Sequence, residues 1–476
     1  MIDTNAIRQK TIELAVTGQL TKDYLSITTA DKYLFEIGVE VKDIPNEDTP
    51  FSIKKGWKWV QLSDLGCDKR NAFADGPFGS NLKREHYTSD KQVRIIQLSN
   101  VGELGWKDEN EKYTTYEHLE TIKRSEVNAG DIVIAKMMPA GRAIIVPEGS
   151  EKYVLSSDCV KFVPNKGLNT RFLCYAINSK MFKKQVLHDV HGIGRERTSL
   201  SKLKSYLLPI PPKDEQDMIV NKIGSVFELL SVIDELQLKY TRDLDILRGK
   251  VIEASMRGLI TEHLQEDGDA ESLFQKIQEE KSSLVKKGLI KKEKQLPSIS
   301  DTDIPFSIPN NWKWVHIGDV LNEVIVPQRD KPEFSGNIPW CRIEDKEGYL
   351  MNGTKSGQYV SEETVNKMNL RVFPKGTVLS ACSGASIGTI LITTVECCTN
   401  QTFNGLVCNS NLFNWYLFWF LKSEINRLKN MGSGSAMAYI SQDKIRGMIM
   451  PLPPLSEQIR IVEVIKNIND ICGVEA

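Results

Sequence analysis

The sequence predicts an α+β protein in which two α/β domains, related by pseudo-two-fold symmetry, are separated by an antiparallel coiled coil of long helices. Three observations predict this fold. Segments of the first half of the chain recur in the second half, a stretch near the middle carries a heptad repeat of apolar residues, and two large blocks mix short strands with helices. The repeated unit is roughly half of the 476 residues, far longer than a solenoid repeat.

The internal repeat rests on three pairs of segments. In the first pair, PFSIKKGWKWV at residues 50–60 returns as PFSIPNNWKWV at residues 305–315. The other two pairs are residues 209–216 with 451–458, and residues 8–21 with 248–261. Because the pairs come from separate places in each half, the whole half is duplicated. A molecule with two similar halves suits a ligand that itself has two separated halves.

Composition and targeting signals predict a cytoplasmic protein without a membrane segment. Hydrophobic residues make up 41% of the chain and charged residues 26%, which is ordinary for a soluble protein. The N-terminus has no signal peptide, and the most apolar stretch, residues 412–421, is too short to cross a bilayer. The nine cysteines show no CxxC spacing, and His188 and His191 lack further ligands at matching spacing, so free thiols, surface histidines and no metal site are expected.

The distribution of charge bears on nucleic-acid binding. A DNA-binding protein needs a basic face, yet the net charge of this chain is −1. Two clusters of basic residues precede the repeated PxPP segments, one with seven basic residues within 180–204 and the other with five within 422–446. Each alone could be a solvated helix face, but their recurrence at equivalent places favours a shared basic surface.

A long helix is predicted to start near Lys213, directly after the first PxPP segment, with Asp214 and Glu215 in its first turn. It would run to Met256, a length of ~66 Å at about 1.5 Å per residue. Apolar residues follow it in alternating steps of three and four, as in a coiled coil. The seam consists of Ile219, Ile223, Val226, Leu230, Ile233, Gln237, Tyr240, Leu244, Leu247, Val251 and Ala254. Its one polar side chain, Gln237, is of the kind that fixes register.

The partner arm of this helix is predicted to come from both ends of the chain. By the repeat, residues 456–472 match the first half of the long helix and residues 4–16 match its second half. The two segments together would form the other arm of an antiparallel coiled coil, unless they are unrelated amphipathic helices. The predicted domains are residues 1–48, a helical arm and connector; 49–208, the first α/β domain; 209–303, the long helix and a linker; 304–450, the second α/β domain; and 451–476, the C-terminal helix.

The two blocks are expected to hold mixed or mainly antiparallel sheets. Runs rich in β-branched residues predict strands, and a longer segment near the end of each block predicts a helix. The predicted strands are residues 93–98, 131–135, 142–146, 377–380 and 388–392, and the predicted helices are residues 169–184 and 413–429. Trp57 and Trp59, like their counterparts in the second block, could stack on a ligand, but their places in the first strand favour anchoring to the core.

Loops with polar donors mark the candidate contact residues. Residues 192–201 and 432–441 are glycine-opened loops beside the basic clusters, and such loops let N–H groups and hydroxyls approach phosphates. Residues 75–84 of the first block have no counterpart in the second. An ordinary turn into a helix is the alternative for each glycine loop. The candidates are Ser80, Asn81, Lys83, Arg84, Arg195, Arg197, Thr198, Ser433, Ser435 and Tyr439.

These signals together resemble one known family. The WKWV start of each block, the glycine loop ending in Ser-Leu-Ser or Tyr-Ile-Ser, the PxPP…EQ segment and the heptad helix are similar to those of the DNA-specificity (S) subunit of type I restriction-modification systems. The GPFGSNLK stretch at residues 76–83 also resembles the opening of one class of target recognition domain of that family. The resemblance covers essentially the whole chain.

The resemblance implies a sequence-specific DNA-binding subunit that is not itself an enzyme. In that family two target recognition domains each read one half of a bipartite, asymmetric double-stranded DNA target. The conserved helices bind two methyltransferase (M) subunits, and restriction (R) subunits join that core. No cofactor is expected on this chain, because S-adenosylmethionine, ATP and Mg²⁺ act on the partner subunits. The helical arm at about residues 1–22 is a departure, because many members start directly with the first recognition domain.

The missing catalytic motifs agree with a non-catalytic role. The chain has no Asp/Asn-Pro-Pro-Tyr/Phe tetrapeptide, which an adenine methyltransferase needs at the flipped base. It also lacks a GxxxxGK[ST] phosphate loop. Two alternatives stay open: a stand-alone DNA-modifying enzyme, which these absences oppose, and a coiled-coil scaffold that does not bind DNA, which the two different loop-rich blocks oppose.

Overall fold

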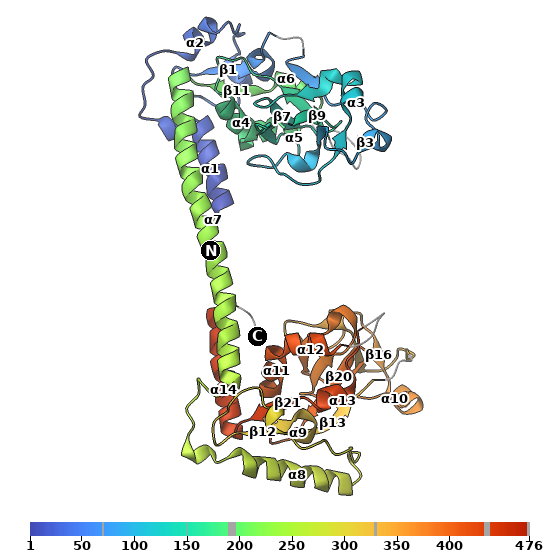
Figure 1. The fold of residues 1–476 in the computed structure, drawn as a ribbon. Helices are drawn as coiled ribbons and strands as arrows, with labels where there is room; N and C mark the ends of the chain where they lie inside the picture. Colours follow the sequence, from blue (N-terminus) through green and yellow to red (C-terminus); the bar gives the residue numbers. More distant parts are fainter. Residues whose placement is uncertain (69–70, 150, 189–196, 328–330, 433–437, 474–476) are drawn as a thin grey trace. The chain divides into compact units, whose positions relative to one another are not determined.

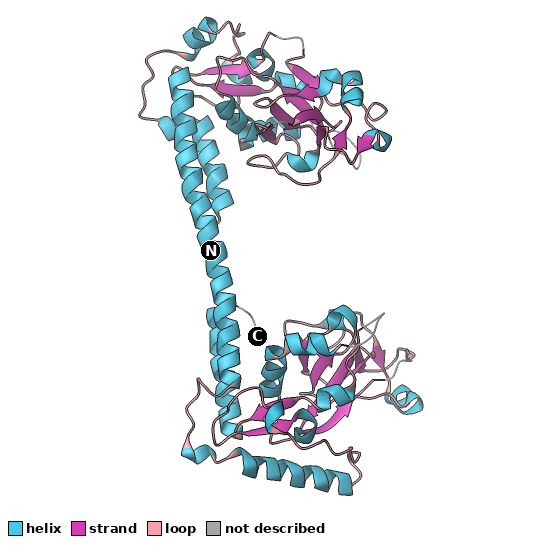
Figure 2. Ribbon diagram, viewed as in Figure 1, coloured by secondary structure: helices cyan, strands magenta, loops and turns pink. Residues whose placement is uncertain are grey.

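The computed structural model describes residues 1–476 apart from 69–70, 150, 189–196, 328–330, 433–437 and 474–476. The chain divides into two compact units, unit 1 with Met1–Leu238 and unit 2 with Lys239–Ala476 (Figure 1). Each unit combines sheets with helices (Figure 2), so the predicted α/β character of both halves is confirmed. Within the described residues, no helix is long and apolar enough to cross a membrane.

Unit 1 is built on a four-stranded antiparallel sheet and a five-stranded mixed sheet. The four strands lie in the order β2, β10, β7, β8, with bounds Phe73–Asp75, Cys159–Phe162, Ile132–Ala135 and Ala143–Ile145. The five lie in the order β3, β5, β4, β9, β6, with bounds Tyr87–Thr88, Tyr113–Thr114, Val93–Ile96, Lys152–Leu155 and Glu126–Val127. Only the β4–β9 pair of these described ladders is parallel. The three strands predicted here are confirmed as β4, β7 and β8.

The four-stranded sheet of unit 1 is buried on both faces. Successive residues of a strand point to opposite faces of the sheet, so the side chains of Ile132 and Ile134 belong to the core that the sheet shares with helices of this unit. The side chains of Val133 and Ala135 belong to a second core, which the sheet shares with the five-stranded sheet. Burial on both faces explains why β7 reads as an unbroken apolar run rather than an alternating one. The described helices of this unit are α1 (Thr4–Val16), α2 (Ala30–Glu36), α3 (Tyr116–Thr121), α4 (Thr170–Asn178), α5 (Lys180–His188), α6 (Leu200–Ser205) and the first part of α7 (Lys213–Met256).

Unit 2 repeats the strand order of unit 1 in its main sheet. The order is β13, β20, β17, β18, β15, with bounds Leu321–Ile325, Phe403–Cys408, Val378–Ala381, Ile390–Thr393 and Leu350–Met351. A second sheet has the order β16, β14, β19, with bounds Tyr359–Val360, Ile338–Cys341 and Cys398–Thr399. The first four strands of the main sheet take the places of β2, β10, β7 and β8, and the strands predicted here are confirmed as β17 and β18. The helices besides α7 are α8 (Ala270–Lys286), α9 (Ile317–Val320), α10 (Glu362–Met368), α11 (Asn414–Ser423), α12 (Ile425–Met431), α13 (Gln442–Arg446) and α14 (Leu455–Ile471).

Each long helix predicted beside a sheet is divided into two short helices. In unit 1, Ser179 between α4 and α5 has an extended backbone with ψ of 153°. Its hydroxyl accepts from the N–H of Phe182 at 3.2 Å, so it caps α5. In unit 2, Glu424 separates α11 from α12. The unbroken helices predicted at 169–184 and 413–429 were wrong. At Ser179 a capping side chain competes with continuation of the helix, which apolar spacing does not reveal. At Glu424 no side chain caps the next helix, and the backbone leaves helical geometry with φ of −96° and ψ of 15°.

The repeated sequence segments pair with one another inside each unit. In unit 1, β1 (Lys58–Gln61) pairs antiparallel with β11 (Leu207–Ile210), which places Trp59 opposite Pro209. In unit 2, β12 (Lys313–His316) pairs with β21 (Ile449–Leu452), which places Trp314 opposite Pro451. The WKWV and PxPP segments therefore recur together because they form one two-stranded ladder at the base of α7 or α14.

The long helix α7 is continuous from Lys213 to Met256 and belongs to both units (Figure 1). In unit 1, α1 (Thr4–Val16) runs antiparallel to it, since Arg8 meets Asp234 at 2.8 Å and Lys222 donates to the carbonyl of Leu20 at 3.0 Å. In unit 2, α14 runs antiparallel to α7, since Arg248 bonds Asn469 and Cys472 lies 3.8 Å from the carbonyl of Leu244. The predicted antiparallel pairing of the long helix with both chain ends is confirmed.

The heptad seam predicted along α7 holds only in part in its second half, where Leu244, Val251 and Ala254 are partly buried. Tyr240 is 59% exposed and Leu247 is 46% exposed, whereas Ile252 and Ser255 are buried. The covered stripe advances by about 3.6 residues per turn, whereas the heptad rule assumed 3.5. This difference amounts to ~20° per heptad, so an extrapolated seam leaves the covered face after a few repeats.

Candidate nucleic-acid interface

In unit 1 the predicted contact segments lie at the side of the four-stranded sheet where β2 and β7 end. β2 and β7 both pair antiparallel with β10, so they run in the same direction and their following loops leave from the same edge. Asp75 ends β2, and its carboxylate lies 2.6 Å from the ammonium of Lys136, the residue after β7. The carbonyl of Lys136 accepts from the N–H of Thr198 at 2.9 Å. Two segments that are distant in sequence therefore flank one ion pair.

The loop that follows β2 is fixed where it leaves the sheet. A Cβ on Gly76 would lie 1.7 Å from the carbonyl oxygen of Ser156, so only glycine fits there. The Gly76 N–H donates to the carbonyl of Cys159 at 3.0 Å, and the Ser125 hydroxyl donates to the carbonyl of Asp75 at 3.0 Å. These contacts set the direction in which the loop departs.

Two stacked histidines hold the far end of the same loop. The rings of His86 and His118 lie 4.0 Å apart and 23° from parallel. Nε2 of His118 donates to the carbonyl of Asn81 at 2.8 Å, and Nδ1 of His86 accepts from the N–H of Lys83 at 3.1 Å. Neither histidine stands out in the sequence as part of a site. The contact that would reveal their role joins His118 to Asn81, 37 residues away in the sequence, and no local sequence pattern predicts it.

The predicted contact residues of unit 1 differ in their access to solvent. Arg197 forms a β-bridge with Met137 and is exposed. Thr198 is only 4% exposed, and its hydroxyl lies 3.2 Å from the hydroxyl of Tyr206, so in this structure it fastens the end of its loop. The other exposed candidates are Ser80, Asn81, Lys83 and Arg84. The candidates that lie outside the described residues are Arg195, Ser433 and Ser435.

Unit 2 has the same arrangement on its main sheet. Tyr439 is 40% exposed and forms a β-bridge with Ser383, which follows β17. The N–H of Ile440 donates to the carbonyl of Cys382 at 2.8 Å. In unit 1 a β-bridge and a backbone hydrogen bond likewise join the end of the glycine loop to the residues after β7. The ends of both glycine loops are therefore attached at equivalent sheet edges.

Comparison of the two blocks by sequence missed one loop of unit 2. β13 takes the place of β2, so residues 326–337 correspond in position to the loop after β2, although their sequences do not match. Within the described part of this loop, Lys331 is exposed and lies 5.5 Å from the ring of Phe334. The correspondence of this loop follows from the strand order, which local sequence patterns do not predict.

Packing withdraws two of the five basic side chains of the second cluster from the surface, whereas Arg427 and Lys429 are exposed. Arg446 is buried and paired with Glu293 at 3.0 Å. Lys422 lies 4.7 Å from the ring centroid of Tyr349, and burial together with the neighbouring charge of Arg248 lowers its pKa to about 8. The prediction of a shared basic surface was wrong for these two side chains, because tertiary packing covers them.

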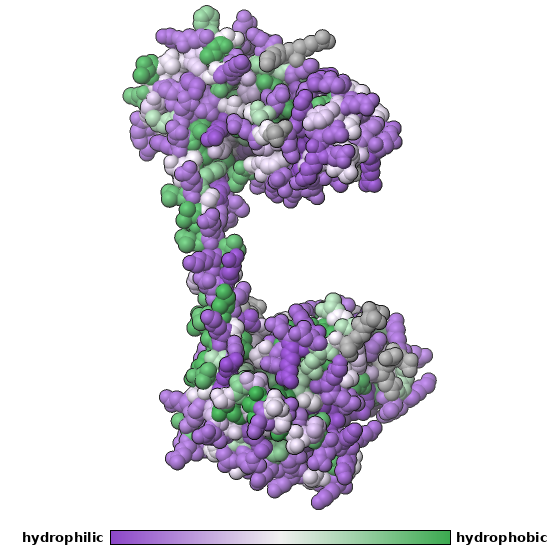
Figure 3. Space-filling model, in the orientation of Figure 1, coloured by the Kyte–Doolittle hydropathy of each residue, from purple (hydrophilic) through white to green (hydrophobic). Residues whose placement is uncertain are grey.

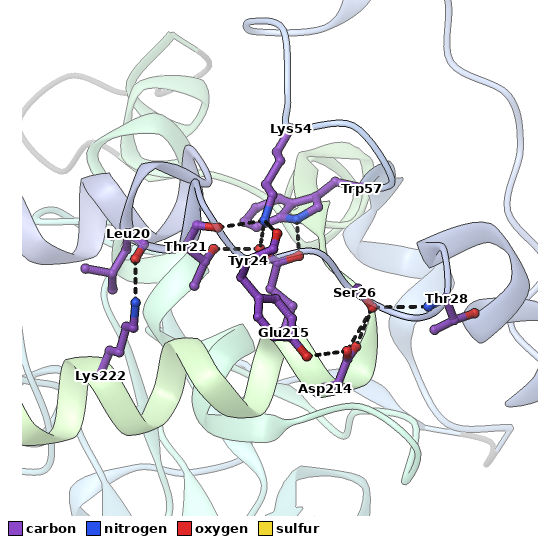
Figure 4. Close-up of polar contacts among 10 residues, drawn as sticks. All are labelled: Leu20, Thr21, Tyr24, Ser26, Thr28, Lys54, Trp57, Asp214, Glu215 and Lys222. Carbon is purple, nitrogen blue, oxygen red and sulfur yellow. Dashed lines mark hydrogen bonds and ion pairs between the residues drawn. The ribbon is translucent and has the colours of Figure 1, made fainter.

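At the base of α7 in unit 1, a buried carboxylate joins three segments of the chain (Figure 4). Glu215 accepts hydrogen bonds from the ammonium of Lys54 at 2.5 Å, the hydroxyl of Thr21 at 2.6 Å and the indole of Trp57 at 2.9 Å. Beside it, burial would raise the pKa of Asp214, but hydrogen bonds from the side chains of Tyr24 and Ser26 outweigh it and hold the pKa below its usual value.

Unit 2 carries an equivalent cluster around Glu457 at the base of α14. This buried carboxylate accepts from the hydroxyl of Thr261 at 2.9 Å, Nδ1 of His263 at 2.7 Å and the indole of Trp312 at 2.8 Å. The prediction that the tryptophans anchor the start of each block to the core is confirmed for Trp57, Trp59 and Trp312, which are buried, whereas Trp314 is half-buried. Both clusters are structural joints between the first strand and a long helix.

The sheet-edge loops of unit 1 carry groups suited to the recognition of nucleic acid. Exposed amide, hydroxyl and guanidinium groups bond to phosphates and to base edges. Across the described ranges, no three His, Cys, Asp or Glu side chains gather to hold a metal ion. Among the described candidates, the exposed cations are Lys83, Arg84 and Arg197, and all three lie in unit 1.

Comparison with known proteins identifies the family. A family model described as the type I restriction modification DNA specificity domain matches residues 54–238 and 309–474. The chain is 20% identical to the type I restriction enzyme EcoEI specificity subunit of Escherichia coli, over 98% of this chain and 89% of the relative. It is 21% identical to the EcoAI specificity subunit of Escherichia coli over the same shares.

Solved structures share the fold at 18% identity. The HsdS subunit from Thermoanaerobacter tengcongensis aligns with a TM-score of 0.50, over 89% of this chain and 92% of that one. A chain from the structure described as "Structural basis underlying complex assembly and conformational transition of the type I R-M system" aligns with a TM-score of 0.58, over 89% and 93%. The family model matches once in each unit, at the repeat that the sequence and the strand order both show. The chain belongs to the specificity (S) subunits of type I restriction-modification systems.

Proposed function

We propose that this chain reads a bipartite, asymmetric double-stranded DNA target, with one half-site read by each unit. Recognition of a DNA target is the general function of the family. The observation that carries the finer proposal is that equivalent sheet edges of the two units present loops of different sequence on the same strand order. A shared frame with different loops is what two different half-sites require.

The exposed loop residues divide by chemistry into two proposed roles. Lys83 and Arg84 are proposed to bind phosphates, while Asn81 and Arg197 have donors suited to base edges. Thr198 is proposed to fix the loop rather than touch DNA, because its hydroxyl is buried against Tyr206. The remaining proposed contacts are Ser80, Arg195, Ser433, Ser435 and Tyr439.

Exposed apolar side chains on α7 support the proposal that its helices dock two methyltransferase (M) subunits. In unit 1, Leu229, Val232 and Leu236 are exposed at steps of three and four, which places them on one face of the helix. In unit 2, Ile246 and Leu247 are exposed on the same helix. Figure 3 shows apolar side chains gathered along α7. A row of this kind marks a protein contact.

The further composition of the complex is proposed from the family. Restriction (R) subunits would join through the core that this chain forms with the M subunits, and the complex would act in the cytoplasm. The chain itself is proposed to be non-catalytic and to hold no cofactor. S-adenosylmethionine, ATP and Mg²⁺ would act on the partner subunits.

The proposal is tested by DNA binding of the purified complex of this chain with its methyltransferase partner. Binding should weaken steeply with salt, and Lys83→Ala should reduce the slope of log affinity against log salt by about one, equally for all sequences. A coiled-coil scaffold without a DNA role would show no salt-dependent shift. S-adenosylmethionine binding by the purified chain alone would instead support a stand-alone modifying enzyme.

A further inference from the structure

Phe78 leaves most of its ring in solvent at the tip of the loop after β2. Its side chain is 74% exposed, whereas Phe73, Phe162 and Phe172 of the same unit are buried in the core. Leaving an aromatic ring in water forgoes the stabilisation that its burial brings. An exposed ring of this size in a proposed binding loop calls for a partner that covers it.

The backbone beneath Phe78 is fixed, so the ring is held out rather than free to fold back. The carbonyl of Phe78 accepts from the N–H of Asn81 at 2.7 Å, which closes a tight turn. The carbonyl of Asn81 in turn accepts from His118, and Pro77 before the ring is buried. A preorganised tip of this kind lowers the cost of ordering the loop on binding.

Donors and cations from this loop and from residues 124–125 lie near the ring, together with the carboxylate of Asp75, which is paired with Lys136. A hollow of about 210 Å³ lies beside Phe78, and its walls include Asn81, Arg124 and Ser125. Lys83 and Arg84 are exposed a few residues further along. An apolar ring among cations and amides is a poor match for an apolar protein surface. It matches nucleic acid, in which base faces are apolar and phosphates are anionic.

We infer that Phe78 inserts its ring as a wedge at one base-pair step of the half-site read by unit 1, with Lys83 and Arg84 on the adjoining phosphates. The inference rests on the proposed function, since it requires the loop after β2 to face DNA. Apolar wedges between base steps partly unstack them and kink the duplex. Pyrimidine–purine steps open most easily, so Phe78 confers a sequence preference at a step where it makes no hydrogen bond.

The test uses the complex of the full chain with its methyltransferase partner. Duplexes carry 2-aminopurine, which fluoresces more strongly when unstacked, at one position at a time across the half-site read by unit 1. The adenine that becomes methylated is left unsubstituted, because its extrusion would give the same signal. The variants are Phe78→Ala, Phe78→Leu and a matched control, Phe35→Ala, in which a phenylalanine that is 84% exposed on α2 is removed.

The wild-type complex should brighten 2-aminopurine at one step. Phe78→Ala should lose this signal and bind about 10-fold to 100-fold more weakly, Phe78→Leu should keep part of both, and Phe35→Ala should match the wild type. Unchanged fluorescence and affinity in Phe78→Ala would overturn the inference. So would release of the methyltransferase partner by Phe78→Ala with DNA signals intact, because the ring would then be a protein contact. A wild-type complex that shows no salt-dependent DNA binding would refute the proposed function instead.

Discussion

At the residue scale, packing decides which charged side chains can reach a ligand. The sequence places Lys422 and Arg446 in one basic cluster, yet Arg446 is buried against Glu293 and Lys422 is packed over Tyr349. A sequence pattern could predict that the cluster exists. It could not predict which of its side chains solvent reaches, because Glu293 and Tyr349 come from distant segments. The burial of Thr198 against Tyr206 escaped prediction for the same reason.

Lys422 gives a prediction about stability and pH. Burial lowers its pKa to about 8 from 10.5, so the unfolded chain holds the proton more tightly than unit 2 does. The penalty for burying the charge is up to about 3 kcal/mol, fully present below about pH 8 and lost as the pH rises towards 10.5. Lys422→Met should therefore raise the free energy of unfolding of unit 2 by about 1–3 kcal/mol at pH 7, and by little near pH 10.5.

Chemical denaturation at the two pH values measures this difference. The matched control is Lys429→Met, which replaces an exposed lysine on the neighbouring helix α12 and should change stability little at either pH. Destabilisation by Lys422→Met at pH 7 would show that the contacts of the ammonium with Tyr349 and Phe418 outweigh the cost of its burial.

At the element scale, local signals predicted most helices and strands, and long-range contacts set the rest. The bounds of α7 match the prediction because proline before the helix and acidic residues in its first turn are local signals. Beyond Gln237 the buried face of α7 departs from the predicted seam, because the position of that face depends on the actual number of residues per helical turn. The strand order, and with it the departure of the loops after β2 and β7 from the same side of the sheet, depends on pairing between segments far apart in the chain and could not be predicted from the sequence.

The carboxylate joint of unit 1 gives the prediction at this scale. Glu215→Gln would leave the partly buried ammonium of Lys54 without its counter-charge. The free energy of unfolding of unit 1 should fall by about 2–4 kcal/mol. Hydrogen exchange of the full chain should then speed up in β1 and β11, while β12 and β21 should exchange as in the wild type because Glu457 still holds their joint.

Glu228→Gln serves as the control for this experiment, because Glu228 is exposed on the same helix. It should change neither ladder. Equal acceleration in the ladders of both units by Glu215→Gln would show that the joints are not independent, against the division of the chain into two units.

At the scale of the whole molecule, α7 is, among the described helices and strands, the element that both units share. We predict that its length contributes to the unread spacer between the half-sites, which should lie about one helical turn of DNA apart. Insertion of seven residues after Gln237 should change the spacer length in the methylated target. The same insertion after Gly288, in the linker that follows α8, should not. An unchanged spacer in a folded α7 insertion variant would contradict this role.

The central claim is that each unit reads its own half-site. The most direct measurement is a binding selection on randomised duplexes with the purified complex of this chain and its methyltransferase partner, for the wild type and Arg197→Ala. The wild type should select two blocks of specified bases separated by an unread spacer. Arg197→Ala should relax a position in the half-site read by unit 1, at a cost of ~1–3 kcal/mol in binding, and leave the other half-site unchanged. Loss of preference in both half-sites together, in a folded variant, would contradict the claim.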